Sequence, residues 1–189
     1  MTSPSGTHRL LMLHKPKGYV VTRSDEKNRK TVYDLLPEWA YQELWMPVGR
    51  LDLDSKGLLL FTQDSKLSDN LTKPGSCHKI YEVWVRGHVT PDHIARILEG
   101  VKVGEDRLKA VSIRITGGVG AKTKLEVELD EGKNRHIRRM FGALKDLKFG
   151  TPLKVLELKR FQIGDLKLDV ESAKWRFLTE AEETKLLTC

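Results

Sequence analysis

The sequence predicts an α+β fold built on a mixed, mostly antiparallel sheet with flanking helices. Short strand-like and helix-like segments follow one another without the regular strand–helix–strand rhythm of a parallel sheet. Residues 79–87 and 122–130 alternate apolar and polar side chains with the period of two that a half-buried strand requires. The 189 residues show no internal repeat and no interdomain linker. The length allows one compact domain or two small lobes that share one sheet.

The first half of the chain supplies three strands and two helical segments. Residues 1–8 are polar and are expected to be loose, which leaves 9–189 as the folded domain. Asp64 is placed to cap a helix that buries Leu67 and Leu71. In chain order we expect a strand at 9–14, a Lys-Pro-Lys-Gly turn at 15–18, a charged loop at 24–30, helical turns from 31 that Pro37 ends, a strand at 57–62, a helix from 65 that 73–75 ends, and a strand at 79–87.

The second half continues the same mixture. Thr90-Pro91-Asp92 predicts the start of a helix, because proline suits the first helical position. Residues 107–116 and 122–130 are expected to be strands around a GGVG turn, followed by a helix at 132–146 and a strand at 152–164. A Thr179–Glu182 capping box predicts a final helix. The buried helical stripes are expected to be Ile94, Ile97 and Leu98 in one helix and Ile137, Met140, Phe141 and Leu144 in the other.

Composition favours an anionic partner and gives no support for a membrane partner. Lysine and arginine number 33 against 26 aspartate and glutamate, which gives a net charge of +7. No apolar stretch approaches the roughly 18–20 residues of a membrane span, and the polar N-terminus carries no export signal. The two cysteines, Cys77 and Cys189, are too far apart in sequence and too few for a metal or disulfide framework. We therefore expect a reduced, cytoplasmic protein.

Residues 47–64, PVGRLDLDSKGLLLFTQD, place two aspartates ahead of a buried strand. Three interpretations compete: a metal loop, an acidic turn and a catalytic carboxylate. As a calcium loop, Asp52, Asp54 and Gly57 would fit positions 1, 3 and 6, but lysine and glutamine occupy positions 5 and 12, where oxygen ligands are needed. The turn interpretation accounts for the D-S-K-G of this segment. It leaves G-R-L-D unexplained.

Residues 131–141, EGKNRHIRRMF, concentrate cations at the start of a predicted helix. Arg135, Arg138 and Arg139 lie three and four positions apart, so they repel one another, and they also oppose the helix dipole. One interpretation is a solvated basic face. The other is that some arginines bind phosphates while one reaches an internal carboxylate. A carboxylate that must stay ionised in a dry pocket needs a fixed cation, and arginine binds carboxylate through two parallel hydrogen bonds.

These stretches together resemble the RsuA/RluB/RluE/RluF family of RNA pseudouridine synthases. The resemblance covers roughly residues 10–160, in the family's order, through HKPKGYVVT, RKTVYDLLP, PVGRLDLDSKGLLLFTQD, KIYEVWVRG and EGKNRHIRRMF, and WRFLTEAE near the end also fits. It implies the pseudouridine synthase catalytic fold, with an active-site cleft across the sheet. The implied activity is isomerisation of a specific uridine in ribosomal RNA by a catalytic aspartate and base flipping, with no cofactor and no metal.

The resemblance also implies roles for single residues. Asp52 matches the catalytic aspartate of the GRLD motif, and Arg50 matches the arginine that helps to hold RNA with its base flipped out. Tyr81 matches the tyrosine that stacks on the target base. Arg138 matches the basic residue paired with the catalytic aspartate, and Ile137 the aliphatic residue that lines the pocket.

Four further cations are expected to bind the substrate. Lys15 falls in the family's N-terminal Lys-Pro turn near the active cleft, and the others are Lys133, Arg135 and Arg139. The chain departs from the family's pattern at His14, Ser65 and His136. A role for His136 as a catalytic acid or base stays open.

The length of the chain before the first strand implies a branch of the family. Only about nine residues precede that strand, so no S4 RNA-binding domain is expected. This matches the RluE-like branch, whose substrate is a uridine in large-subunit (23S) ribosomal RNA. The expected partner is therefore ribosomal RNA, bound by a monomer, with no membrane and no small-molecule cofactor.

Two other functions fit the residues alone. If Asp52 and Asp54 formed a general acid–base pair, the protein would be a hydrolase that releases uracil or sugar. A non-catalytic RNA-binding or ribosome-assembly module would use the basic surface and have no use for Asp52. Within the synthase interpretation, Asp52 acts as a nucleophile or as a base, and Tyr81 is either a stacking residue or ordinary strand core.

Overall fold

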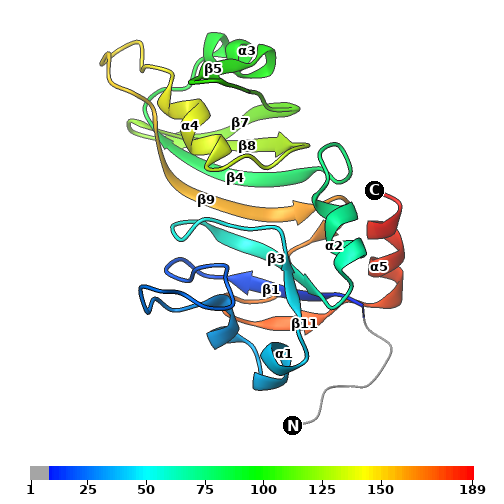
Figure 1. The fold of residues 1–189 in the computed structure, drawn as a ribbon. Helices are drawn as coiled ribbons and strands as arrows, with labels where there is room; N and C mark the ends of the chain where they lie inside the picture. The colour runs from blue at the N-terminus through cyan, green and yellow to red at the C-terminus, as the bar shows by residue number, and fades with distance from the viewer. Residues whose placement is uncertain (1–8) are drawn as a thin grey trace. The chain divides into compact units, whose positions relative to one another are not determined.

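The computed structural model describes residues 9–189, so the expectation of a loose segment at 1–8 falls outside the described part. The chain divides into two compact units. The first comprises the residues up to Cys77 together with Arg160–Cys189, and the second is His78–Lys159. Both units combine strands with helices, which confirms the predicted α+β class (Figure 1). A sheet shared by the two lobes stays a prediction.

The first unit is built around β1 (Leu11–Lys15), a strand of mostly buried residues. This strand pairs antiparallel with β3 (Lys56–Thr62) on one side and β11 (Trp175–Phe177) on the other. The run Leu58–Phe61 is fully buried, as expected of a strand covered on both faces. The other elements are β2 (Met46–Val48), β10 (Leu166–Lys167), the 3-10 helix η1 (Val32–Leu35) and the helices α1 (Glu38–Gln42), α2 (Ser65–Thr72) and α5 (Glu180–Leu187).

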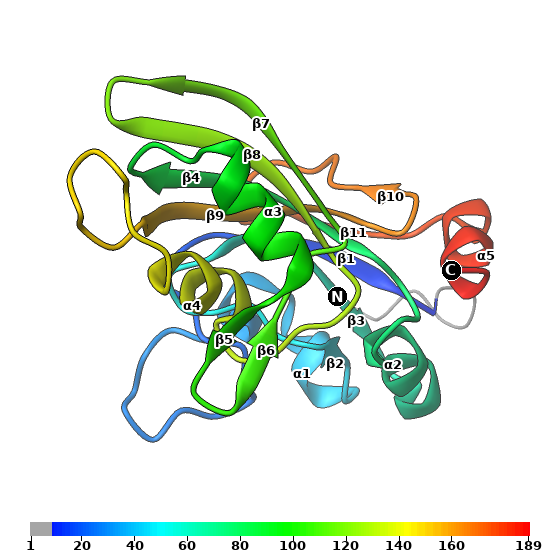
Figure 2. The ribbon, with the colours of Figure 1, turned by 90° about the horizontal axis from the view of Figure 1, so that it is seen from above.

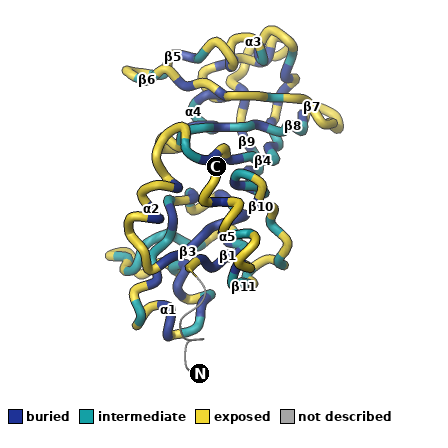
Figure 3. Tube along the Cα trace, turned by 90° about the vertical axis from the view of Figure 1, so that its right-hand side faces the viewer, coloured by how far each residue is buried: buried dark blue, intermediate teal, exposed yellow. Residues whose placement is uncertain are grey.

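An apolar cluster holds helices α2 and α5 to the strands of the first unit. Both predicted caps are present: the Asp64 carboxylate accepts from the Leu67 amide at 3.1 Å, and Thr179 forms a capping box with Glu182. Figure 3 shows β1 and β3 as largely buried segments. The buried members of the cluster are Leu10, Met12, Val48, Leu58, Leu60, Leu67, Leu71, Cys77, Ile163, Leu166, Leu178 and Leu186.

In the second unit, β8 (Lys122–Leu129) lies between β4 (Lys79–Arg86) and β7 (Ser112–Val119), and both pairings are antiparallel. The predicted alternation is confirmed, because Tyr81, Val83, Val85, Leu125, Val127 and Leu129 are all buried. The remaining elements are the helices α3 (Pro91–Glu99) and α4 (His136–Gly142), the hairpin of β5 (Val101–Val103) and β6 (Asp106–Leu108), and β9 (Lys154–Ile163), which ends in the first unit (Figure 2).

The predicted buried stripe of α3 is confirmed at Ile97, whereas Ile94 is only half-buried and Leu98 is exposed. Helix α3 buries His93 and Ile97, whereas Leu98 is 41% exposed. His93 turns inward because both of its ring nitrogens find backbone partners. The Thr90 amide donates to Nδ1 at 3.1 Å, and Nε2 donates to the carbonyl oxygen of Lys145 at 2.9 Å.

The strand expected at 107–116 and the following turn also differ from the structure. Residues 106–108 form a separate hairpin with β5, and β7 continues through two of the glycines that were expected to form the turn. A Cβ at Gly118 would lie 2.7 Å from the carbonyl oxygen of Lys122, so this glycine permits close strand pairing. Helix α4 is shorter than expected, because Arg135 has a left-handed φ of 48° and ends the preceding loop.

Cys77 and Cys189 form a disulfide, which corrects the expectation of two reduced cysteines. Their Cα atoms are 5.1 Å apart although 112 residues separate them in the sequence. The sequence distance was a poor guide because Cys77 and Leu186 of α5 belong to one core cluster. The disulfide therefore joins the C-terminal residue, Cys189, to Cys77, the last residue of the first of the two segments that form this unit.

Reduction of this disulfide should lower the free energy of unfolding by about 2–4 kcal/mol, because the bond restricts a long loop in the unfolded chain. Chemical unfolding with and without dithiothreitol measures the effect. Reduced protein should unfold at a lower denaturant concentration, and Cys189→Ser should match the reduced protein under both conditions. Identical midpoints for wild-type protein with and without reductant would contradict this.

Candidate active site

The loop between β2 and β3 carries Asp52 and begins with the G-R-L-D motif. The expected acidic turn is present, with the Ser55 amide donating to the carbonyl oxygen of Asp52 at 3.0 Å. Gly57, the second residue of β3, has a φ of 119°, and a Cβ at this position would collide with the backbone carbonyl of Arg160. Only glycine fits there. The turn chemistry and the close backbone approach therefore fix the exit of the Asp52 loop.

Lys15, at the end of β1, fixes the same loop from inside. Its side chain is fully buried, and its Nζ donates to the carbonyl oxygens of Pro16, Asp52 and Ser55 at 3.1, 3.1 and 2.9 Å. Burial lowers the pKa of Lys15 to about 8, although Asp52 and Asp54 act in the opposite direction. A second link is the Gly18 amide, which donates to the carbonyl oxygen of Leu53 at 2.8 Å. The Lys-Pro-Lys-Gly turn and the Asp52 loop are thus bound together.

Asp52 lines a cleft with a volume of about 460 Å³ that lies within the first unit. One wall of the cleft is the segment Arg50–Leu53, which contributes both Arg50 and Asp52. The facing wall comes from the loop after β1. Its lining residues are Val20, Val21, Thr22, Ser24, Asp25, Glu26, Lys27 and Arg29.

The loop that faces Asp52 is organised by an ion pair. Arg29 donates from Nε and Nη2 to the carboxylate of Asp25 at 3.0 and 2.6 Å, and the Arg29 amide donates to the same carboxylate at 2.9 Å. These contacts with Arg29 hold the pKa of Asp25 at about 2. The sequence predicts only a charged loop at 24–30. The four-residue spacing of Asp25 and Arg29 was the one signal available, and it also occurs at ordinary solvated positions.

Tyr81 lies in β4 of the second unit, opposite Val127 of β8. Tyr81 is only 7% exposed, and its side chain lies on the buried face of β4 together with Val83 and Val85. The location agrees with a strand-core residue and also leaves the aromatic ring on the face predicted from the sequence.

Helix α4, also in the second unit, carries Ile137 and Arg138. Ile137 is 2% exposed, together with Met140, Phe141 and Leu144, so the predicted apolar stripe is confirmed. The Arg138 side chain is oriented by a hydrogen bond from Nη1 to the carbonyl oxygen of Val155 at 3.0 Å. Its guanidinium group is therefore held by β9.

The carboxylate of Asp106 pairs with cations near the start of α4. Arg139 donates from Nη2 to the Asp106 carboxylate at 2.8 Å and to the carbonyl oxygen of Val103 at 3.2 Å. Lys133 Nζ lies 3.7 Å from Asp106 and 3.3 Å from Glu131. The Arg139 contact lowers the pKa of Asp106. Arg135 is exposed. Sequence reasoning missed Asp106, which lies about thirty residues before these cations.

His136 is buried within the second unit. Its Nε2 donates to the carbonyl oxygen of Lys109 at 3.0 Å, and burial lowers the pKa of the ring. Its Nδ1 lies 4.0 Å from the Glu131 carboxylate. This environment favours a neutral imidazole with a structural hydrogen bond.

The structure brings three of the predicted site residues together within one unit. Lys15 binds the carbonyl oxygen of Asp52, and Arg50 lines the same cleft as Asp52. The other six belong to the second unit: Tyr81, Lys133, Arg135, Ile137, Arg138 and Arg139. The predicted pairing of Asp52 with Arg138 joins residues of the two units and stays a prediction.

Over residues 9–189, no group of three or more histidine, cysteine, aspartate or glutamate side chains is arranged to hold a metal ion. In the same range, no helix is both long enough and apolar enough to cross a membrane.

Comparison with known proteins identifies the family. The profile of the RNA pseudouridylate synthase family matches residues 9–143, and the crystal structure of a pseudouridylate synthase aligns with a TM-score of 0.81. That alignment has 30% identity and covers 95% of this chain and 74% of the other. The chain belongs to the RNA pseudouridylate synthase family.

Two similar proteins are named as ribosomal subunit pseudouridine synthases. Ribosomal large subunit pseudouridine synthase B of Haemophilus influenzae is 38% identical over 161 residues, which cover 85% of this chain and 43% of the relative. Ribosomal small subunit pseudouridine synthase A of Vibrio vulnificus is 34% identical over 177 residues, which cover 92% of this chain and 72% of the relative. The chain therefore spans less than half the length of the large-subunit relative.

Lys15→Met should alter the pH dependence of stability. The pKa of Lys15 falls from an ordinary value of 10.5 to about 8 in the folded protein. Between these values the unfolded chain holds the proton and the folded protein does not, so the stability of wild-type protein should rise with pH across this window. Lys15→Met should lack this rise, whereas Lys66→Met, at an exposed position of α2, should retain it. Unfolding midpoints measured from pH 7 to 10.5 test this; parallel curves for wild type and Lys15→Met would contradict the buried ammonium.

Proposed function

We propose that the protein is a ribosomal RNA pseudouridine synthase that isomerises a specific uridine of large-subunit RNA, with Asp52 as the catalytic carboxylate. The observation that carries the proposal is the position of Asp52, on a loop fixed by the buried Lys15 and open to a cleft of about 460 Å³. Binding clefts for small ligands have volumes of roughly 300–1,000 Å³, so a single nucleotide can be accommodated. Membership of the family supports the reaction class.

The reaction rearranges one uridine and leaves its composition unchanged. The bond between uracil N1 and ribose C1′ breaks, the uracil turns, and C5 forms the new bond to C1′. The hydrogen on C5 leaves as a proton and N1 gains one, so no oxidant or nucleotide is consumed. Asp52 contributes either as a nucleophile towards the nucleoside or as a base that removes a proton.

A uridine in folded RNA must leave its stack before it can enter the cleft. Extruding a base costs a few kcal/mol. In this proposal Arg50, on the wall of the cleft beside Asp52, helps to hold the RNA in the flipped state. Stacking of the extruded uracil on Tyr81 offsets part of the cost, because stacking on an aromatic ring contributes about 1–3 kcal/mol per base.

The remaining site residues divide into positioning and RNA-binding groups. Lys15, which the sequence assigns to substrate binding, is fully buried with its ammonium group among three backbone carbonyl oxygens, so in this proposal it positions the loop of Asp52 instead. Arg138, whose guanidinium group is oriented by the carbonyl oxygen of Val155, supplies the fixed cation for Asp52. Ile137 contributes an apolar side chain to the wall of the uridine pocket. The phosphate contacts are assigned to Lys133, Arg135 and Arg139.

The names of the relatives support ribosomal RNA as the substrate. One relative is named for the large subunit and the other for the small subunit, and they are 38% and 34% identical to this chain. We assign the large subunit because the large-subunit relative has the higher identity of the two. The enzyme is proposed to act as a monomer in the cytoplasm.

Asp52→Asn should abolish the reaction while leaving RNA binding within a few-fold of wild type. The substitution removes the acid–base or nucleophilic group with little change in volume, and loss of such a group costs about 10²–10⁴-fold or more in rate. Tritium released from RNA labelled at uracil C5 measures turnover. Asp54→Asn is the matched control, since it removes the same charge two residues away and should keep activity.

Wild-type turnover by Asp52→Asn would remove this residue from the mechanism. Free uracil in place of tritium release, together with loss of activity in Asp54→Asn, would support the hydrolase. Wild-type protein that binds RNA and releases neither product would support the binding module.

Arg138→Ala should reduce turnover at saturating RNA, whereas Arg135→Ala should act on binding. Removing the fixed cation leaves a carboxylate without its partner, while removing an exposed arginine removes one phosphate contact. Arg135→Ala should lower the slope of log affinity against log salt by roughly one unit. Arg139→Ala should also weaken binding, and it additionally removes the contact with Asp106.

Salt-dependent binding combined with single-turnover rates separates these effects. Arg138→Ala with normal turnover at saturation and only weaker binding would show that the pair with Asp52 is misassigned.

A further inference from the structure

The loop of residues 145–150, between α4 and β9 of the second unit, exposes large apolar side chains beside cations. Leu147 is 70% exposed and Phe149 is 55% exposed. Lys145 and Lys148 are exposed in the same loop. Adjoining exposed apolar side chains rimmed by polar residues are typical of interaction sites.

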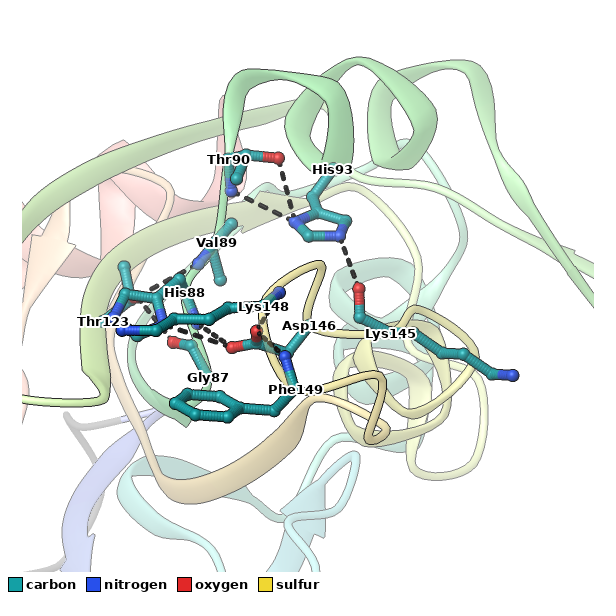
Figure 4. A network of polar contacts seen from close by, with 10 residues as sticks. All are labelled: Gly87, His88, Val89, Thr90, His93, Thr123, Lys145, Asp146, Lys148 and Phe149. Carbon is teal, nitrogen blue, oxygen red and sulfur yellow. Dashed lines mark hydrogen bonds and ion pairs between the residues drawn. The ribbon is translucent and has the colours of Figure 1, made fainter.

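A buried carboxylate holds the 145–150 loop in one conformation. The Asp146 side chain is 1% exposed, and its Oδ1 accepts from the amides of Lys148 and Phe149 at 2.8 and 3.1 Å (Figure 4). Its Oδ2 accepts from the His88 amide at 2.6 Å and lies 3.3 Å from His88 Nδ1. These contacts, the His88 amide foremost, hold the pKa of Asp146 at about 2.

The start of the loop is held independently. Nε2 of His93 donates to the carbonyl oxygen of Lys145 at 2.9 Å, and the Gly150 amide donates to the carbonyl oxygen of Asp146 at 2.8 Å. Figure 4 shows the loop fastened by Asp146 to the turn after β4 and by Lys145 to α3. The exposed side chains are therefore displayed on a fixed backbone, which reduces the ordering cost of binding.

Phe149 lies at the centre of a small aromatic and cationic surface. The His88 ring is 6.0 Å from the Phe149 ring at an angle of 34°, and Lys148 Nζ lies 5.4 Å from the centre of the same ring. His88 is itself 46% exposed in its side chain. The carboxylate of this region, Asp146, is turned inward onto backbone amides. The outer side of the loop thus carries aromatic faces and positive charge.

We propose that the 145–150 loop and His88 form a second RNA-binding surface, on which Phe149 stacks against an unpaired base while Lys145 and Lys148 contact phosphates. The inference rests on the proposed function, since the RNA is an unpaired segment of the substrate away from the target uridine. An aromatic ring flanked by cations fits the alternation of base and phosphate in a single strand. An apolar protein surface would pair poorly with the two lysines.

The binding test uses fluorescein-labelled single-stranded oligouridylate of twelve nucleotides and an RNA duplex of the same length. Phe149→Ala should weaken binding of the single strand by about 5- to 150-fold, the fold-change that corresponds to one stacked base, and should spare the duplex. Phe149→Trp should retain affinity. Leu147→Ala removes a similarly exposed apolar side chain of the same loop that has no ring to stack on a base, so it should weaken binding of the single strand far less than Phe149→Ala. Lys148→Ala should reduce the salt slope by roughly 0.7.

A direct optical readout separates stacking from other effects. The added indole of Phe149→Trp should be quenched by oligouridylate, whereas the indole of Leu147→Trp should not. Quenching of neither, equal loss for single strand and duplex in Phe149→Ala, or unchanged affinity in that variant would each overturn the proposal. Asp52→Asn tests the proposed function by turnover and leaves this surface intact, so either proposal can fail alone.

Discussion

The buried ammonium group of Lys15 is the constraint on which the candidate site depends. Its three hydrogen bonds reach Pro16 and both ends of the Asp52 turn. A buried ammonium is stable only when its protons are satisfied, so the backbone of residues 52–55 must keep its present path. The central strand β1 therefore transmits its position directly to the loop that carries Asp52. A loop on the edge of a cleft would otherwise be among the more mobile parts of a protein.

The cations near the start of α4 in the second unit also have defined partners. Three arginines near the start of α4 predicted an anion, and the structure supplies Asp106 to Arg139 and, at a longer distance, to Lys133. Arg138 is oriented by a backbone carbonyl and Arg135 is exposed. The helix therefore carries one guanidinium group of fixed orientation and follows one that is exposed to solvent.

Local patterns predicted much of the fold because they depend on neighbours in sequence. The Asp64 cap, the alternation in β4 and the apolar stripe of α4 were all readable in this way. The motif around Asp52 could be placed for the same reason. The misses depend on contacts between distant segments: the Cys77–Cys189 bond, the inward turn of His93, and the facing wall of the cleft around Arg29. No local periodicity encodes such contacts. The resemblance placed Lys15 near the cleft, but only the coordinates gave its ammonium group backbone partners.

The central claim is that a carboxylate on the Asp52 loop rearranges uridine within an intact RNA chain. Quantitative nucleoside analysis of large-subunit ribosomal RNA, after incubation with wild-type protein, tests this most directly. The account predicts that pseudouridine rises by the amount by which uridine falls, with no free uracil released. Release of free uracil, or unchanged nucleoside content in RNA that the protein binds, would contradict it.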